Sequence, residues 1–125
     1  MTATQRDLVG YGGAPPDPRW PGGARVAVSF VVNFEEGGEY SIADGDGENE
    51  AVYEIDQRLA GLPDPAIDSH FEYGTRAGWW CIMEVLAAHG AAATVSASGR
   101  AVERTPRLAR DAVRRGHEVA AHGWR

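Results

Sequence analysis

The chain has 125 residues, of which 43% are hydrophobic and 24% are charged. These values are typical of a globular protein and limit the chain to one domain. The formal net charge of −6 argues against a nucleic-acid partner. No apolar stretch is as long as a membrane span, and the polar start at residues 1–6 lacks the apolar core of a signal peptide, so we expect a cytoplasmic protein without a membrane partner.

Residues 1–24 are predicted to form an irregular N-terminal arm, because Gly and Pro crowd its second half. An apolar run then predicts a strand over Arg25–Asn33, and an unbroken run is typical of a buried strand in a parallel sheet. The run stops at Glu35 and Glu36, beyond the carboxyl end of the strand, where α/β folds collect their chemistry. Alone, such an acidic pair is more often the solvated start of a loop.

Residues 37–68 carry many Gly, Asp and Glu residues and predict a long connection, with a possible short helix around Ala51–Leu59. A connection this long is either a functional loop or disordered. The pattern then predicts a helix over Thr75–His89, stopped by Gly90. Its expected packing face comprises Trp79, Ile82, Met83, Val85 and Leu86. The single Cys81 is expected to be buried in this helix, which fits a reducing compartment.

A short strand is predicted at Ala91–Ser96, followed by a turn at Ser98–Gly99. Thr105 and Pro106 then suggest an N-cap with proline in the first helical position, so we expect a helix over Pro106–Arg115 that ends at Gly116. Its expected packing face comprises Leu108, Ala109, Ala112 and Val113. A group of arginines is expected to form a solvated polar face: Arg100, Arg104, Arg107, Arg110, Arg114 and Arg115.

The last predicted strand, His117–Ala121, delivers His122 to its carboxyl end. The order of strands and helices predicts an α/β fold with parallel strands and right-handed crossovers. In such a sheet the ends of the strands share one edge, so His122 and the pair Glu35 and Glu36 could meet there as an active site. Considered alone, His122 is more often a packed or loop histidine.

Five segments occur in order along the chain: 7–12, 20–22, 33–39, 72–79 and 118–123. Together they resemble the polysaccharide deacetylase superfamily, and most of all its branch containing the allantoinase of purine degradation. The resemblance implies a distorted (β/α) barrel of seven strands. It also implies hydrolysis of a non-peptide carbon–nitrogen bond, in either an N-acetyl sugar or a cyclic amide such as allantoin.

The resemblance also implies roles for the acidic pair. Metal-dependent members end the first strand in two aspartates, one a base and one a metal ligand, whereas this chain has Glu35 in the place of the base and Glu36 in that of the ligand. The extra C–C bond moves each carboxylate by roughly 1.5 Å, which is large against metal–oxygen tolerances. The second metal-binding histidine would stand four residues after His122, at position 126. We therefore expect no metal, with zinc or another divalent ion as the alternative.

Three residues before the helix match the segment that indicates the allantoinase branch, and we expect Glu72, Tyr73 and Arg76 to position the substrate. Arginine offers a planar fork of donors that suits ureido and carbonyl oxygens. A structural ion pair is an equally good interpretation of Arg76.

Seven strand–helix units require roughly 250 residues by analogy with eight-stranded barrels. Residues 25–125 would therefore be the first three units of the barrel, that is, its N-terminal part. Three strands leave an open sheet edge, so we expect marginal stability or self-association as a homo-oligomer. Three functions remain open: an allantoinase-like cyclic-amide hydrolase, a metal-dependent carbohydrate N-deacetylase, and an inactive fragment that serves as an assembly module.

Overall fold

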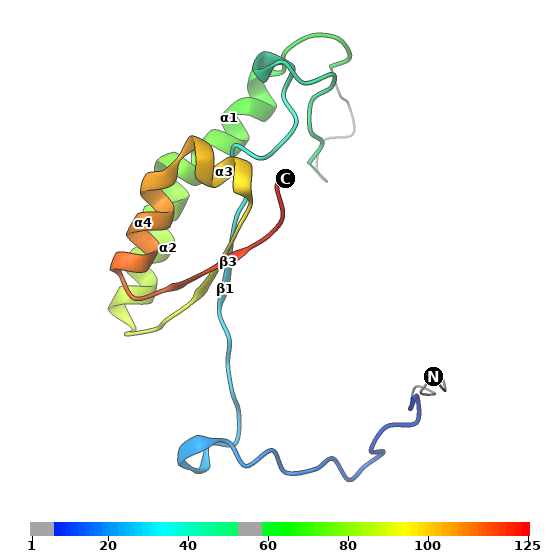
Figure 1. Cartoon of the computed structure of the whole chain (residues 1–125), viewed down its shortest axis with the longest axis vertical. Helices are drawn as coiled ribbons and strands as arrows, with labels where there is room; N and C mark the ends of the chain where they lie inside the picture. Colours follow the sequence, from blue (N-terminus) through cyan, green and yellow to red (C-terminus); the bar gives the residue numbers. More distant parts are fainter. Residues whose placement is uncertain (1–6, 53–58) are drawn as a thin grey trace, which may run out of the picture.

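A three-stranded parallel sheet organises the chain, as a computed structural model that describes residues 7–52 and 59–125 shows (Figure 1). The strands are β1 (Val31–Phe34), β2 (Thr94–Ala97) and β3 (Glu118–Ala121), in the spatial order β1-β2-β3. Both neighbouring pairs are parallel. The predicted α/β organisation with parallel strands is thus confirmed, and the sheet is not closed into a barrel.

The register of the sheet aligns the carboxyl ends of all three strands. Phe34 pairs with Ala97, and Ala97 pairs with Ala121. The residues that follow each strand therefore leave the sheet from the same edge. This edge carries the candidate site described below.

The first strand is shorter than predicted, because none of the described strands lies beside residues 25–30. Among these residues, the Phe30 carbonyl accepts one hydrogen bond, from Thr94 N–H at 2.9 Å, before the ladder proper begins. Val26 and Val28 are each 71% exposed. The apolar run that predicted a strand from Arg25 thus leads out of the sheet toward residues 7–24 of the N-terminal arm, which extend away from the folded part in Figure 1.

The helical segment between β1 and β2 begins ten residues earlier than predicted. It consists of α1 (Pro65–Tyr73), a π-helical turn η3 (Gly74–Gly78) and α2 (Trp79–Ala88). Asp64 caps its start, because Asp64 Oδ1 accepts hydrogen bonds from the backbone N–H groups of Ala66 at 3.1 Å and Ile67 at 3.2 Å. The Asp64-Pro65 pair was the missed signal. The possible helix around Ala51–Leu59 falls mostly on residues 53–58, outside the described residues.

Between β2 and β3 the chain forms two helices, α3 (Gly99–Arg104) and α4 (Pro106–Arg114). The predicted second helix is confirmed as α4, and Gly116 follows it with a left-handed φ of 85°. Helix α3 was missed where only a turn was expected. Its N-cap is Ser98, whose Oγ accepts a hydrogen bond from Ala101 N–H at 3.3 Å. Two short 3₁₀ turns, η1 (Pro21–Gly23) and η2 (Ile42–Asp44), complete the described elements.

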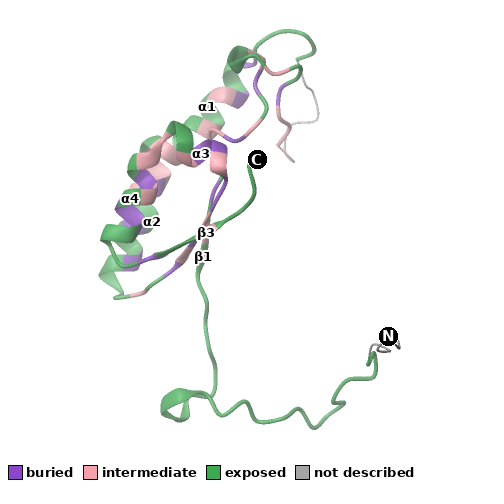
Figure 2. Cartoon of the chain, in the orientation of Figure 1, coloured by how far each residue is buried: buried purple, intermediate pink, exposed green. Residues whose placement is uncertain are grey.

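The core lies between the sheet and the helices that cover one of its faces (Figure 2). Phe34 and Trp79 meet there with ring centroids 5.8 Å apart. The cluster of buried apolar residues comprises Phe34, Trp79, Met83, Leu86, Ala93, Val95, Ala97, Ala101, Leu108 and Ala112. In the described ranges no helix is long and apolar enough to cross a membrane.

Four residues predicted to be buried on the helices are exposed instead. Ile82 is 44% exposed, Val85 60% and Val113 63%, and Cys81 is also exposed. Each helix buries only the side that faces the sheet, and no described element covers its other side. The apolar pattern of α2 is therefore broader than the surface that the described residues bury.

A buried carboxylate links α2 to α4. Asp111 is 2% exposed and accepts hydrogen bonds from Trp79 Nε1 at 3.0 Å, from Arg115 Nε at 2.8 Å and from Arg114. Burial raises the pKa of Asp111, but the hydrogen bonds from Trp79 and the two arginines outweigh it, and the pKa lies below its ordinary value. The carboxylate therefore stays ionised and fixes the relative position of the two helices.

Replacing Asp111 by alanine should destabilise the fold, because the buried Trp79 indole N–H would lose its acceptor. An unsatisfied buried donor costs about 1–3 kcal/mol, and we expect a loss of this size in the free energy of unfolding measured in urea. Glu84→Ala, on the exposed side of α2, is the control and should cause little change. Equal stability of the two variants would contradict the structural role of Asp111.

Candidate active site

Glu35 and His122 meet at the carboxyl-end edge of the sheet. Glu35 Oε1 lies 3.3 Å from His122 Nε2. The His122 backbone N–H donates to the Ala97 carbonyl at 2.9 Å, which continues the strand ladder by one residue and fixes where the imidazole begins. Both side chains are about half exposed, so the pair adds little to stability. The pair matters for its geometry, because it places a carboxylate and an imidazole within reach of one bound molecule.

A recess of about 390 Å³ opens beside this pair. Arg125 forms part of its wall, with its guanidinium 4.2 Å above the Tyr40 ring and hydrogen bonded to Asp46 Oδ1 at 2.7 Å. The recess is lined by Glu35, Gly38, Glu39, Tyr40, Glu50, Phe71, His122 and Arg125. A small molecule in this recess would contact both members of the acid–imidazole pair.

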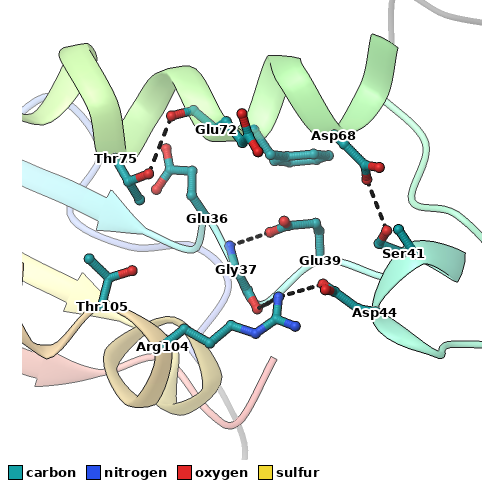
Figure 3. A pocket seen from close by; sticks show the side chains of 12 residues that line it. Glu36, Gly37, Glu39, Ser41, Asp44, Asp68, Glu72, Thr75, Arg104 and Thr105 are labelled. Atoms are coloured by element: carbon teal, nitrogen blue, oxygen red, sulfur yellow. Dashed lines mark hydrogen bonds and ion pairs between the residues drawn. The ribbon is translucent and has the colours of Figure 1, made fainter. Parts of the chain in front are cut away.

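Glu36 lies in a different recess, of about 310 Å³, between the end of β1 and the helical segment (Figure 3). Glu72 and Thr75 line the same recess. Glu36 Oε2 accepts a long hydrogen bond of 3.3 Å from the Glu35 backbone N–H. The two adjacent glutamates therefore occupy different recesses, and only Glu35 faces His122.

The turn after the acidic pair requires glycine. Gly37 has a φ of +98°, in the region that side chains disfavour. The next residue closes the turn, because Gly38 N–H donates to the Glu35 carbonyl at 2.7 Å. The chain thereby reverses directly after Glu36 and brings the loop with Tyr40 back to the recess.

Asp46 ties this loop to the rest of the protein. It accepts hydrogen bonds from Arg125 at 2.7 Å, from Arg100 NH1 at 2.9 Å and from Ser41 N–H at 3.1 Å. These bonds, the one from Arg125 first, hold the pKa of Asp46 well below its ordinary value. A second pair, Arg104 NH1 to Asp44 Oδ2 at 2.5 Å, anchors the same loop to α3.

One arginine departs from the predicted solvated face. Arg100 is only 9% exposed, because it reaches from α3 to Asp46 and to the Glu39 carbonyl, 3.1 Å away. The prediction that all six arginines form a solvated helix surface is wrong at this position. Nothing in the sequence indicated that Arg100, which was expected before the helix, would pair with Asp46, 54 residues earlier.

The three residues expected to position the substrate do not line the recess of Glu35 and His122. Glu72 lines the recess of Glu36, and Tyr73 lines a groove beside it. Arg76 NH2 lies 3.1 Å from Glu72 Oε2, and both side chains are more than half exposed. As placed here, Arg76 makes a helix ion pair four residues apart. Tyr40 and Arg125, which line the recess, and Asp46, which binds Arg125, were not predicted, because no motif or spacing distinguishes them.

The described residues do not form a complete metal site. Within residues 7–52 and 59–125, no group of three or more His, Cys, Asp or Glu side chains could hold an ion. Glu35 and His122 would supply two ligands, whereas a catalytic zinc site uses three from the protein.

The fold and the site define an α/β protein with parallel strands and a carboxylate–imidazole pair at the strand ends. The chain belongs to the polysaccharide deacetylase family, whose sequence profile matches residues 61–125.

Three proteins are similar to this chain over nearly its whole length. A Schizosaccharomyces pombe protein, whose name places it among the polysaccharide deacetylases, is 39% identical over 126 aligned residues, covering 96% of this chain and 39% of that protein. The crystal structure of PuuE allantoinase matches with a TM-score of 0.87 and 44% identity, over 98% of this chain and 42% of that one. A probable polysaccharide deacetylase from Pseudomonas aeruginosa PAO1 has the same TM-score, 0.87, at 43% identity and the same coverage. The chain thus spans about two fifths of the length of these relatives.

The contribution of Asp46 to stability should depend on pH. Because its pKa is lower in the folded state than in the unfolded state, the ionised carboxylate stabilises the fold above about pH 4, and this contribution is lost as the pH falls below that value. The difference in unfolding free energy between the wild type and Asp46→Asn should therefore shrink on acidification, as urea unfolding at several pH values can measure. A difference that grows at low pH, or one matched by the exposed control Glu103→Gln, would contradict this role.

Proposed function

We propose that this chain supplies the acid–base part of an active site that hydrolyses a non-peptide carbon–nitrogen bond, with a cyclic amide such as allantoin as the substrate. The observation that carries the proposal is the 3.3 Å approach of Glu35 Oε1 to His122 Nε2 beside a recess of about 390 Å³. The structural similarity to PuuE allantoinase, at 44% identity, supports the choice of substrate class.

The chemistry follows from the two side chains. Glu35, as the general base, would take a proton from a water molecule while the water oxygen attacks the amide carbonyl carbon. The carbon–nitrogen bond then breaks, the carbonyl carbon becomes a carboxylic acid, and the ring nitrogen leaves with a proton. His122 would supply that proton or, alternatively, orient the carbonyl oxygen.

The finer fold assignment is part of this proposal. Residues 25–125 would form the first three strand–helix units of a distorted (β/α)₇ barrel, with residues 1–24 as an arm. The exposed apolar side chains support it: Phe30 is 50% exposed, Val31 59% and Val119 37%. Further strands of a barrel, or a second copy of the chain, would cover this surface.

A metal-dependent carbohydrate N-deacetylase is the second candidate. The similarity to polysaccharide deacetylases at 39% and 43% identity favours it. The two-ligand arrangement of Glu35 and His122 disfavours it, because the remaining carboxylate of the pair, Glu36, lies in the other recess.

Replacing Glu35 by glutamine should remove the base and lower the rate of allantoin hydrolysis by about 10²–10⁴, while circular dichroism shows an intact fold. The assay would use the 125-residue chain itself and a chimera in which it replaces the matching segment of the 44%-identical allantoinase. Glu84→Gln is the exposed control. Wild-type turnover of Glu35→Gln would contradict the proposal, and inactivity of both unmutated forms would favour the assembly module.

The two candidate functions differ in their metal requirement. For the cyclic-amide hydrolase we expect no stoichiometric metal in elemental analysis of the purified protein and no loss of turnover in a chelator. Zinc at one equivalent that disappears in His122→Ala, together with release of acetate from N-acetyl sugars, would establish the deacetylase instead.

The substitution Arg76→Lys tests whether Arg76 binds the substrate or has only a structural role. If its guanidinium binds ureido or carbonyl oxygens, Arg76→Lys should raise KM or lower kcat by about tenfold, because lysine cannot form the planar bidentate contact. Steady-state kinetics of the chimera with allantoin would measure this. Unchanged kinetics would leave Arg76 as the helix ion-pair partner of Glu72.

A further inference from the structure

Gly74, the first residue of the π-helical turn η3, is a glycine where the backbone does not require one. Its φ of −56° and ψ of −49° are ordinary helical values. Glycine inside a helix costs about 1 kcal/mol relative to alanine, so some other interaction must account for its presence. The other glycine of this turn, Gly78, also has helical dihedral angles.

The space above Gly74 is filled by the Glu36 side chain. A methyl group at position 74 would overlap Oε1 and Cδ of Glu36 and lie 2.7 Å from its Cγ. At Gly78 the same methyl group would make ordinary contacts, the nearest at 3.6 Å to Tyr73 Cε1. The close approach is therefore specific to the pair Glu36 and Gly74.

The Glu36 carboxylate has one hydrogen bond and one close contact with the helical turn. Oε1 lies against Gly74, and Oε2 accepts the hydrogen bond from the Glu35 backbone N–H at 3.3 Å. The Glu35 side chain leaves the same backbone in the direction of His122. A displacement of Glu36 would therefore remove one of the hydrogen bonds that hold the backbone from which Glu35 projects.

We propose that Gly74, by having no side chain, leaves the space that the Glu36 carboxylate occupies. Glu36 is then a positioning residue that holds Glu35 in contact with His122. This inference rests on the proposed role of Glu35 as the general base. Turns of this kind recur at functional sites, and this one brings Gly74 against Glu36, which follows β1.

The test is a double-mutant cycle on Gly74→Ala and Glu36→Ala, in the chain and in the chimera described above. Gly74→Ala should lower kcat by about 10–100-fold with little change in KM, because small displacements of a reacting group have effects of this order. Glu36→Ala should cause a similar loss, and the double variant should be no worse than either single variant. Gly78→Ala, the matched control, should keep wild-type turnover.

Two further measurements separate positioning from a general loss of stability. The Glu35 amide resonance of the 125-residue chain should shift by the same amount in Gly74→Ala, Glu36→Ala and the double variant, and should stay in place in Gly78→Ala. The melting temperature of the double variant should exceed that of Gly74→Ala, because removing Glu36 relieves the overlap.

Wild-type kcat in Gly74→Ala, or losses that multiply in full in the double variant, would overturn the inference. In that case a strong effect of Glu35→Gln would leave the proposed function standing. Wild-type turnover of Glu35→Gln would instead overturn the proposed function itself.

Discussion

The register of the parallel sheet is the constraint on which the rest of the structure depends. Phe34, Ala97 and Ala121 stand in one row, so the chain leaves all three strands at the same edge. Glu35 and His122, 87 positions apart in sequence, reach 3.3 Å for this reason. A slip of one residue in either ladder would turn every side chain of that strand to the opposite face and separate the pair.

Ion pairs hold the loop after β1 against the rest of the candidate site. Asp46 binds Arg100 and Arg125, and thereby joins the loop to α3 and to the segment after β3. Tyr40 is held beneath the Arg125 guanidinium by the same network. The two acidic side chains point in different directions. Glu35 points toward the His122 imidazole, and Glu36 points toward the helical segment. The proposed chemistry would therefore depend on loop contacts as well as on strand ends.

The sequence predicted the parallel sheet, because an unbroken apolar run and alternating elements carry enough local signal. It also indicated that the pair Glu35 and Glu36 could meet His122 at one edge, and in the structure Glu35 alone does so. It did not predict that β1 begins only at Val31, since pairing depends on the length of the neighbouring strand. The burial of Arg100 was missed for a similar reason: its partner Asp46 lies on a loop without periodicity. Ile82 and Val113 were expected in the core because helical patterns indicate apolar faces without showing which elements cover them.

The central claim is that Glu35 and His122 act as one unit on a carbon–nitrogen bond. A double-mutant cycle of Glu35→Gln and His122→Gln, measured as kcat/KM for allantoin in the chimera, tests it most directly. Residues that act as a unit are non-additive, so the account predicts that the double variant retains nearly the activity of the more damaged single variant. Losses that multiply in full would show that the two side chains act independently and would contradict the account.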